Sequence, residues 1–537
     1  MRTHRNSRYV INAVAVIGLL CAVGASANSL NGQKAGKASS GTVIQKKLAS
    51  TTAYARDLEA LAIAAISEDP AEAESAIEQL RAAGQAGLDA MFRVHKDMIA
   101  SARDGASQVS FSPDTWMTPA KARLKTALEA IGQQYDVHAS CLYWHTDFAA
   151  AKAEAQAAGK PILSLRLLGN LDEECSCANS RFFRTALYAN ENVSNYLRNN
   201  YVLHWKSVRP VPKITIDYGD GRVLERTITG NSIHYLLTPD GRIMDALPGL
   251  YGPQAFMGEL ANMKAYSDSI LNMSEEQQAE TLARLHSDIV RELSNRLSAD
   301  LQTVAAAQEA EAQETEAQQQ EESTSASAVR AAIEAAVATA TERPNGDNAA
   351  AANNRTIGKR VVEGPLLTAM SITEQDAIAN QELAGSIDDA TWARIAALHS
   401  DQATLDESSV ALMREHRPNA VVAGLLTVSK ALVEDPMVRM VANFQRSIAE
   451  DTVRNEYTFR RQIHEWFALA GPGMNSIDVD SLNERVYAEL FLTPSSDPWL
   501  GLMPADYSAL RADGLSLHQP RAGDSGSSPQ PSPSNQE

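Results

Sequence analysis

The sequence predicts an α/β domain in the middle of the chain, with mostly α-helical regions on both sides of it. Apolar residues recur at helical spacing before residue 138 and again after residue 267. Between these regions lie short apolar runs of strand length and two pairs of alternating runs separated by turn residues. A chain of 537 residues, at roughly 100–200 residues per domain, has room for several such units.

The composition excludes several classes of protein. The formal net charge is −18, whereas binding to nucleic acid or to an anionic lipid surface requires a concentrated positive field. Four cysteines are too few for a disulfide-dense scaffold. We therefore expect protein partners and no nucleic acid, and no sequence motif indicates a cofactor.

The N-terminus predicts export. Three arginines in the first eight residues precede an uncharged, mostly apolar stretch at 10–24, and Ala25-Ser26-Ala27 has the small-x-small form that signal peptidase cleaves. We assign 1–27 as a signal peptide, because 10–24 is shorter than the ~20 apolar residues of a membrane-spanning helix. Lipidation at Cys21 is disfavoured because Leu20, not a small residue, precedes it. The expected product has no integral membrane segment and is periplasmic or secreted.

Two segments lead into the central domain. Residues 28–50 are rich in Gly, Ser, Ala and Lys without an apolar period, which predicts a flexible leader. Residues 51–138 show helical periods, with Asp69-Pro70 as an N-cap and first-turn proline and a further helix beginning near Pro119. We expect this helical region to support the domain that follows.

Residues 139–266 alternate between helix and strand signals, which is typical of an α/β layer arrangement. Thr146 is the expected N-cap of an alanine-rich helix that Gly159 ends. The expected elements that follow are a strand at 161–168, a helix capped by Asn190, a strand at 201–205, hairpins at 214–228 and 233–247, and a closing helix at 253–266.

The order of several landmarks in residues 140–265 resembles the thioredoxin-like fold, in its secreted single-domain branch. No landmark is specific alone, but their order is, and we expect the chain to belong to a group of exported bacterial proteins built around this domain. The landmarks are Trp144, Gly159-Lys160-Pro161, the apolar run 162–168, Phe182-Phe183, Asn190 to Val193, Asn200-Tyr201-Val202 and the hairpin from Tyr235 to Asp245.

Departures from the family pattern are equally informative. The resemblance places the nucleophile of a C-x-x-C motif on Cys177 and leaves Ser180 at the resolving position, which makes a monothiol variant. The family's cis-proline, which faces that motif two residues after a glycine, is replaced by Ser232 after Gly230. The hairpin around 219–221 stands where the family often has a helix.

The candidate catalytic residues are Cys177, Cys175 and Ser180, with Arg181, Ser232 and His234 as accessory residues. A helix N-terminus and Arg181 would favour the thiolate of Cys177, whereas the glutamates just upstream would oppose it. Cys175 or Cys141 would act as the resolving thiol, Ser180 would donate a hydrogen bond to the thiolate, and His234 would suit a proton-transfer role near the thiol. Metal binding by the two neighbouring cysteines with His204 or His234 is a weaker alternative, because the spacing fits no common zinc signature.

The remaining chain is expected to be helical, apart from two disordered segments. A long helix at 267–305 carries an apolar stripe over 282–304 that would pack on a neighbouring domain or form a coiled-coil seam in a homo-oligomer. We expect a disordered acidic and alanine-rich linker at 306–355, a helical domain at 356–515 and a disordered tail at 516–537. The segment around Trp499 would cap that domain or dock a partner.

Two functions follow. The first is a non-catalytic binding or scaffold module of the cell envelope, and the second is a monothiol disulfide oxidoreductase or isomerase that uses Cys177 as nucleophile. Whether the protein is an enzyme is thus left open by the sequence. The loss of the second motif cysteine and of the cis-proline favours the scaffold.

Overall fold

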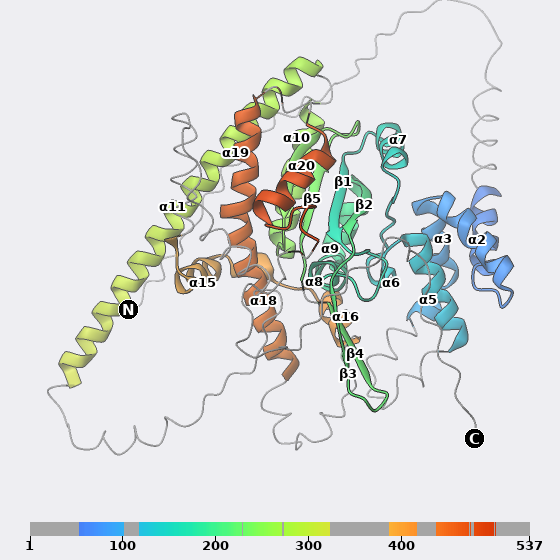
Figure 1. Cartoon of the computed structure of the whole chain (residues 1–537), viewed down its shortest axis with the longest axis horizontal. Helices are drawn as coiled ribbons and strands as arrows, with labels where there is room; N and C mark the ends of the chain where they lie inside the picture. Colours follow the sequence, from blue (N-terminus) through green and yellow to red (C-terminus); the bar gives the residue numbers. More distant parts are fainter. Residues whose placement is uncertain are drawn as a thin grey trace, which may run out of the picture. The chain divides into compact units, whose positions relative to one another are not determined.

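The computed structural model describes residues 53–100, 118–227, 229–270, 273–322, 386–415, 436–471, 473, 477–498 and 500. These residues are mostly helical, with a small mixed sheet of four strands in the middle (Figure 1). The predicted signal peptide, leader and tail, most of the predicted linker, and Trp499 lie outside the described residues.

The N-terminal helices form a hydrophobic cluster of their own. They are a helix at residues 53–64, α2 (Pro70–Ala82), α3 (Gln85–Val94), α5 (Pro119–Gly132) and the short α6 (Val137–Ser140). Asp69 caps α2 as predicted, because its side chain accepts from the Ala71 N–H at 3.0 Å. Leu80, Leu88 and Leu128 are among the buried residues of this cluster.

The sheet is built from β1 (Ile162–Leu168), β2 (Val202–Arg209), β5 (Ser232–Leu237) and β6 (Ile243–Pro248) in the order β2-β1-β5-β6. β1 pairs parallel with β2, and β5 pairs antiparallel with both β1 and β6. Every residue of β1, β5 and β6 is buried. Elements cover both faces of the sheet, which explains why these strands read as short apolar runs.

The helices that connect the strands end where capping residues stand. In α7 (Phe148–Ala158) the N-cap is Asp147, one residue later than the predicted Thr146, because the Asp147 carboxylate accepts from Ala149 N–H at 2.7 Å. Gly159 ends α7 in the left-handed conformation at φ +64°, as expected of a C-cap glycine. Asn190 caps α9 (Glu191–Asn200), as predicted.

Two long helices follow the sheet. α10 (Pro253–Ile270) is the predicted closing helix, and α11 (Glu275–Glu322) is longer than predicted. Residues 306–322, expected to belong to a disordered linker, instead continue α11, because Ala, Glu and Gln are strong helix formers. The apolar stripe of α11 is buried within the chain: Leu282, Leu293 and Leu297 lie in hydrophobic clusters, and α11 packs along α19 (Arg461–Ala470).

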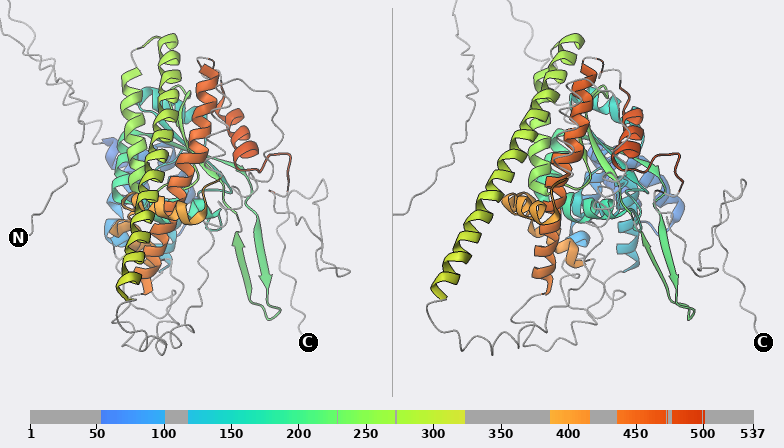
Figure 2. Two further views of the ribbon diagram at one scale, coloured as in Figure 1. Left: turned by 90° about the vertical axis from the view of Figure 1, so that its left-hand side faces the viewer. Right: turned by 60° about the vertical axis from the view of Figure 1, so that its left-hand side comes forward.

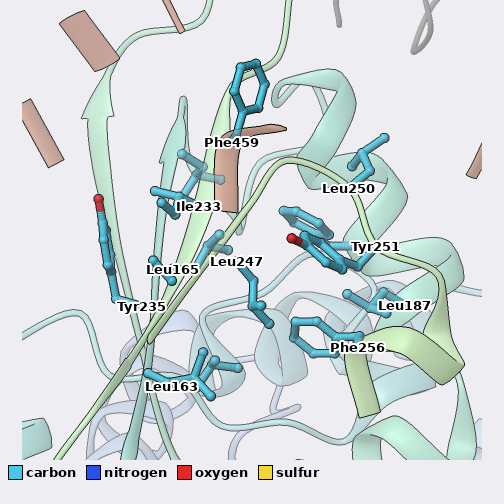
Figure 3. Packing of buried hydrophobic residues seen from close by; sticks show 14 of the residues in the cluster. Leu163, Leu165, Leu187, Ile233, Tyr235, Leu247, Leu250, Tyr251, Phe256 and Phe459 are labelled. Carbon is cyan, nitrogen blue, oxygen red and sulfur yellow. The ribbon is translucent and has the colours of Figure 1, made fainter. Parts of the chain in front are cut away.

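The described helices of the predicted C-terminal region, 356–515, pack into the same core as the sheet. Figure 3 shows Leu165, Ile233 and Leu247 of the sheet gathered with Phe256 of α10 and Phe459 of the C-terminal region. Apolar periodicity in the sequence shows that a helix has a buried face, but it does not show which element packs against that face. These helices are α15 (Asp389–Leu398), η5 (Ser400–Ala403), α16 (Glu407–Glu415), α18 (Pro436–Asn455), η7 (Glu456–Arg460), α19, α20 (Val479–Arg485) and η9 (Val486–Leu490).

A separate two-stranded hairpin is inserted between β2 and β5. Its strands, β3 (Lys213–Asp217) and β4 (Val223–Thr227), pair only with each other among the described strands. Figure 2 shows the hairpin extending away from the helices and the main sheet. All of β3 is exposed to solvent.

None of the helices in the described ranges is both long enough and apolar enough to span a membrane.

Candidate functional site

Cys177 stands at the N-terminus of a short helix, as the sequence predicted. It is the N-cap of α8 (Ala178–Phe182), which the π-helical turn η2 (Phe183–Leu187) continues. The Cys177 Sγ accepts a hydrogen bond from the Ser180 backbone N–H at 3.4 Å. The sulfur thus takes the place that a serine or aspartate oxygen fills at most helix starts.

The Cys177 thiol has no contact with solvent. Its relative exposure is 0%, and it belongs to the hydrophobic core around the sheet. Burial raises the pKa of Cys177 above its ordinary value, and the N–H groups of Ser180 and Asn179 and the charges of Arg181 and Arg184 offset that rise only in part. The protonated thiol is therefore the dominant form at neutral pH.

The residues next to Cys177 are occupied by other contacts. The Ser180 hydroxyl accepts from Ser176 Oγ at 2.9 Å, and the hydrogen bond from Ser180 to the sulfur comes from its main-chain N–H. Arg184 lies under the same loop and donates to Ser176 Oγ at 3.1 Å. Cys175 is half-buried, and none of Cys141, Cys175 and Cys177 forms a disulfide.

The Ser232 loop, the residues just before β5 together with Ser232 at its start, faces α8. Asn179 Nδ2 donates to Ser232 Oγ at 2.8 Å. A Cβ atom at Gly230 would lie 2.8 Å from Asn179 Oδ1 and 3.0 Å from Asn179 N, so only glycine allows this approach. Every described peptide bond is trans, including the one before Ser232.

The C-terminal segment holds this loop on its other side. Tyr487 donates its hydroxyl proton to the Asn231 carbonyl at 3.1 Å, and Asn231 Nδ2 donates to Thr493 Oγ1 at 3.1 Å. Arg209, at the end of β2, donates to the carbonyls of Pro494 and Asp497 at 3.1 Å each. No sequence signal indicated this closure, because the partners are more than 250 residues apart.

His234 is a packed core residue. Its Nε2 forms a hydrogen bond of 2.6 Å with the Tyr188 hydroxyl, and the ring centroids of Phe183 and Phe256 lie 4.7 Å and 5.0 Å from its own. Burial lowers the pKa of His234 to about 3, so the ring is neutral at physiological pH. The contacts of His234 are with Tyr188, Phe183 and Phe256, and this geometry gives no support for proton transfer with Cys177.

The structure does not bring a metal-binding set together in the described part of the chain. His204 Nδ1 is within 2.8 Å of Ser164 Oγ, on a strand at the far side of β1 from His234. No group of three or more His, Cys, Asp or Glu side chains there is placed to hold an ion. The two cysteines and His204 or His234 are not such a group.

A buried charge network, which no local sequence signal indicates, connects β6 with the C-terminal helices. Asp245 is fully buried and accepts from Arg460 at 2.8 Å and from His464 at 2.9 Å, and Arg460 also donates to Glu259 at 2.8 Å and to Glu456. Burial alone would raise the pKa of Asp245, but Arg460 and His464 hold it well below its usual range.

Two cavities lie near α10. The first, about 270 Å³, is lined by Glu259, Arg296, Glu456 and Tyr457 among others and borders the charge network. The second, about 430 Å³, lies between α9 and the start of α10 and is lined mainly by asparagine amides. Neither cavity is lined by Cys175 or Cys177.

Comparison with known proteins adds no assignment. No protein-family model, no curated protein and no solved structure matches this chain. The chemistry of the site is therefore inferred from its geometry alone. The site is a buried, neutral thiol surrounded by packed side chains and hydrogen bonds.

Proposed function

We propose that this protein is a non-catalytic binding or scaffold module of the cell envelope, built on a thioredoxin-like domain at residues 140–265. The element order of strand, helix, strand, hairpin and helix, with one parallel and two antiparallel pairings, supports that fold. The position of Cys177 at the start of α8 and the hydrogen bond from Asn179 of α8 to Ser232 support it further. The N-terminal arginines and the apolar stretch at 10–24 support export to the periplasm or beyond.

The observation that carries the non-catalytic proposal is the complete burial of Cys177. Thiol exchange requires a thiolate that can reach a disulfide sulfur, and this sulfur is both protonated and enclosed. The loop opposite it is bound by Tyr487 and Thr493 of the same chain. A substrate would have to displace these contacts before it met the thiol.

A second candidate function, a monothiol disulfide oxidoreductase or isomerase, keeps one observation in its favour. The Cys177 sulfur accepts an N–H hydrogen bond at a helix start, and the charges of Arg181 and Arg184 favour its thiolate. If the C-terminal segment moved away from the Ser232 loop, these groups would stabilise a reactive thiolate at Cys177. Cys175, two residues earlier in the sequence, would then be the resolving thiol.

The two candidates differ in a disulfide-exchange assay. The full-length protein and its Cys177→Ser variant are each incubated with a dithiol peptide and oxidised glutathione, and the rate of peptide oxidation is followed. We expect both proteins to give the rate of glutathione alone. A rate increase that the Cys177→Ser variant loses would reject the non-catalytic proposal and establish the second candidate.

A further inference from the structure

The hairpin β3–β4 presents an apolar face that is largely exposed to solvent. Side chains alternate between the two faces of a strand, so Ile214, Ile216 and Tyr218 share one face with Leu224, which pairs with Ile216. Their relative exposures are 46%, 44%, 54% and 47%. An isolated two-stranded hairpin is marginally stable in water, and an exposed apolar patch marks an interaction surface.

The open edge of β3 offers unpaired backbone groups in a fixed pattern. The Tyr218 N–H donates to the Arg222 carbonyl at 3.1 Å, so alternation along the antiparallel ladder makes Ile214 and Ile216 the residues bonded to β4. The N–H and C=O groups of Lys213, Thr215 and Asp217 therefore point away from β4, toward solvent. Such an edge is a template for another strand.

The sequence of β3 is complementary to itself when it runs antiparallel. With Thr215 opposite Thr215 of a second copy, Lys213 faces Asp217 of the second copy, and Ile214 faces Ile216 of the second copy. Opposite charges and apolar pairs both stabilise such cross-strand positions. In this register the three residues whose backbone groups point outward lie opposite one another. The backbone hydrogen bonds between the two copies of β3 therefore form without a change of strand register.

The edge of β4 lacks this property. Its own antiparallel pairing, centred on the middle residue, would place Glu225 opposite Glu225 of the second copy, and like charges directly opposite are destabilising. The sequence predicts that the apolar stripe of α11 could form a seam between copies, but this stripe packs within the chain.

We propose that two copies of this chain associate through the open edges of β3, in a two-fold symmetric, four-stranded sheet of order β4-β3-β3-β4 centred on Thr215. The two apolar faces then join into one continuous patch. Two-fold dimers use the same surface patch on both subunits, which is the relation that β3 satisfies. This inference goes beyond the proposed function and does not depend on the state of Cys177.

Charge reversal tests the register. Sedimentation equilibrium of the full-length protein over a range of concentrations gives the dimer dissociation constant. The Lys213→Asp variant places two like-charged pairs in the interface, so we expect that constant to rise by roughly tenfold or more. The double variant Lys213→Asp/Asp217→Lys restores both pairs, and we expect it to dimerise as the wild type does.

The matched control is Glu225→Lys on the opposite strand, which should leave the dissociation constant unchanged. All three changes lie on exposed positions, and far-ultraviolet circular dichroism checks that the fold is retained. The proposal is overturned if the wild type stays monomeric up to roughly 100 μM. It is also overturned if the wild type dimerises but Lys213→Asp does not change the dissociation constant, since the interface would then lie elsewhere.

Discussion

Two buried histidines make the stability of the fold depend on pH. Burial lowers the pKa of both His204 and His234 to about 3, whereas in an unfolded chain the value is about 6.5. Between these values the unfolded state binds more protons, so the free energy of unfolding falls as the pH falls from 6.5 toward 3. Each histidine costs about 1 kcal/mol per pH unit over most of that window.

A substitution isolates the contribution of His234 to this pH dependence of stability. His234→Gln retains a side chain that can form a hydrogen bond with the Tyr188 hydroxyl, and it removes the titration. Urea unfolding at pH 7 and at pH 5 should show a smaller loss of stability for the variant than for the wild type. An identical loss in both proteins would mean that His234 does not stay neutral in the folded state.

Gly230 is the residue that allows the Ser232 loop to approach α8. Gly230→Ala should destabilise the protein by about 1–3 kcal/mol, because the new methyl group would meet the Asn179 backbone. Gly258→Ala is the matched control, since it lies inside α10 with nothing within 4 Å of its new Cβ, and should be neutral or stabilising. Chemical denaturation of both variants measures the difference; equal effects would show that the loop does not lie against Asn179.

At the scale of elements, one arginine holds β6, α10 and the C-terminal helices together. Arg460→Met would leave Asp245, Glu259 and Glu456 without their shared cation, and we expect a loss of about 3–5 kcal/mol. Arg291→Met on α11 removes an exposed ion pair with Asp288 and should change stability by less than about 1 kcal/mol. If thermal or urea unfolding shows similar effects for both variants, the buried network contributes nothing specific.

Local sequence signals predicted the elements well where the cause is local. Asn190 and Asp69 are caps, Gly159 is a stop signal, and the short apolar runs became β1 and β5. The same local reasoning ended the long helix too early, because an acidic stretch rich in alanine and glutamine can be helical without a buried face.

The placement of Cys177 shows how far such reasoning reaches into the candidate site. Its position at the start of α8 is the one that the resemblance implies, and α8 contacts Ser232 through Asn179. The sequence leaves open whether Cys177 is buried, because the core that contains it includes residues such as Phe459, more than 250 residues later in the chain. The network of Asp245 and Arg460 was missed for the same reason.

At the scale of the whole molecule, the sheet and the described C-terminal helices form one core, so the two parts should stay together when the chain is cut between them. A protease site inserted between residues 322 and 386 allows a clean test. After cleavage we expect both fragments to elute together in size-exclusion chromatography and to separate only in denaturant, since Leu165 and Phe459 belong to one buried cluster. Separate elution of two folded fragments would contradict a shared core.

The central claim is that Cys177 is a neutral structural thiol, buried in the core that the sheet shares with the C-terminal helices. Differential alkylation of the native protein, with peptide mass mapping and a series of pH values, measures this for Cys175 and Cys177 side by side. The structure predicts that half-buried Cys175 reacts while Cys177 stays protected until global unfolding. Rapid alkylation of native Cys177 with an apparent pKa below the free value of about 8.5 would contradict the claim.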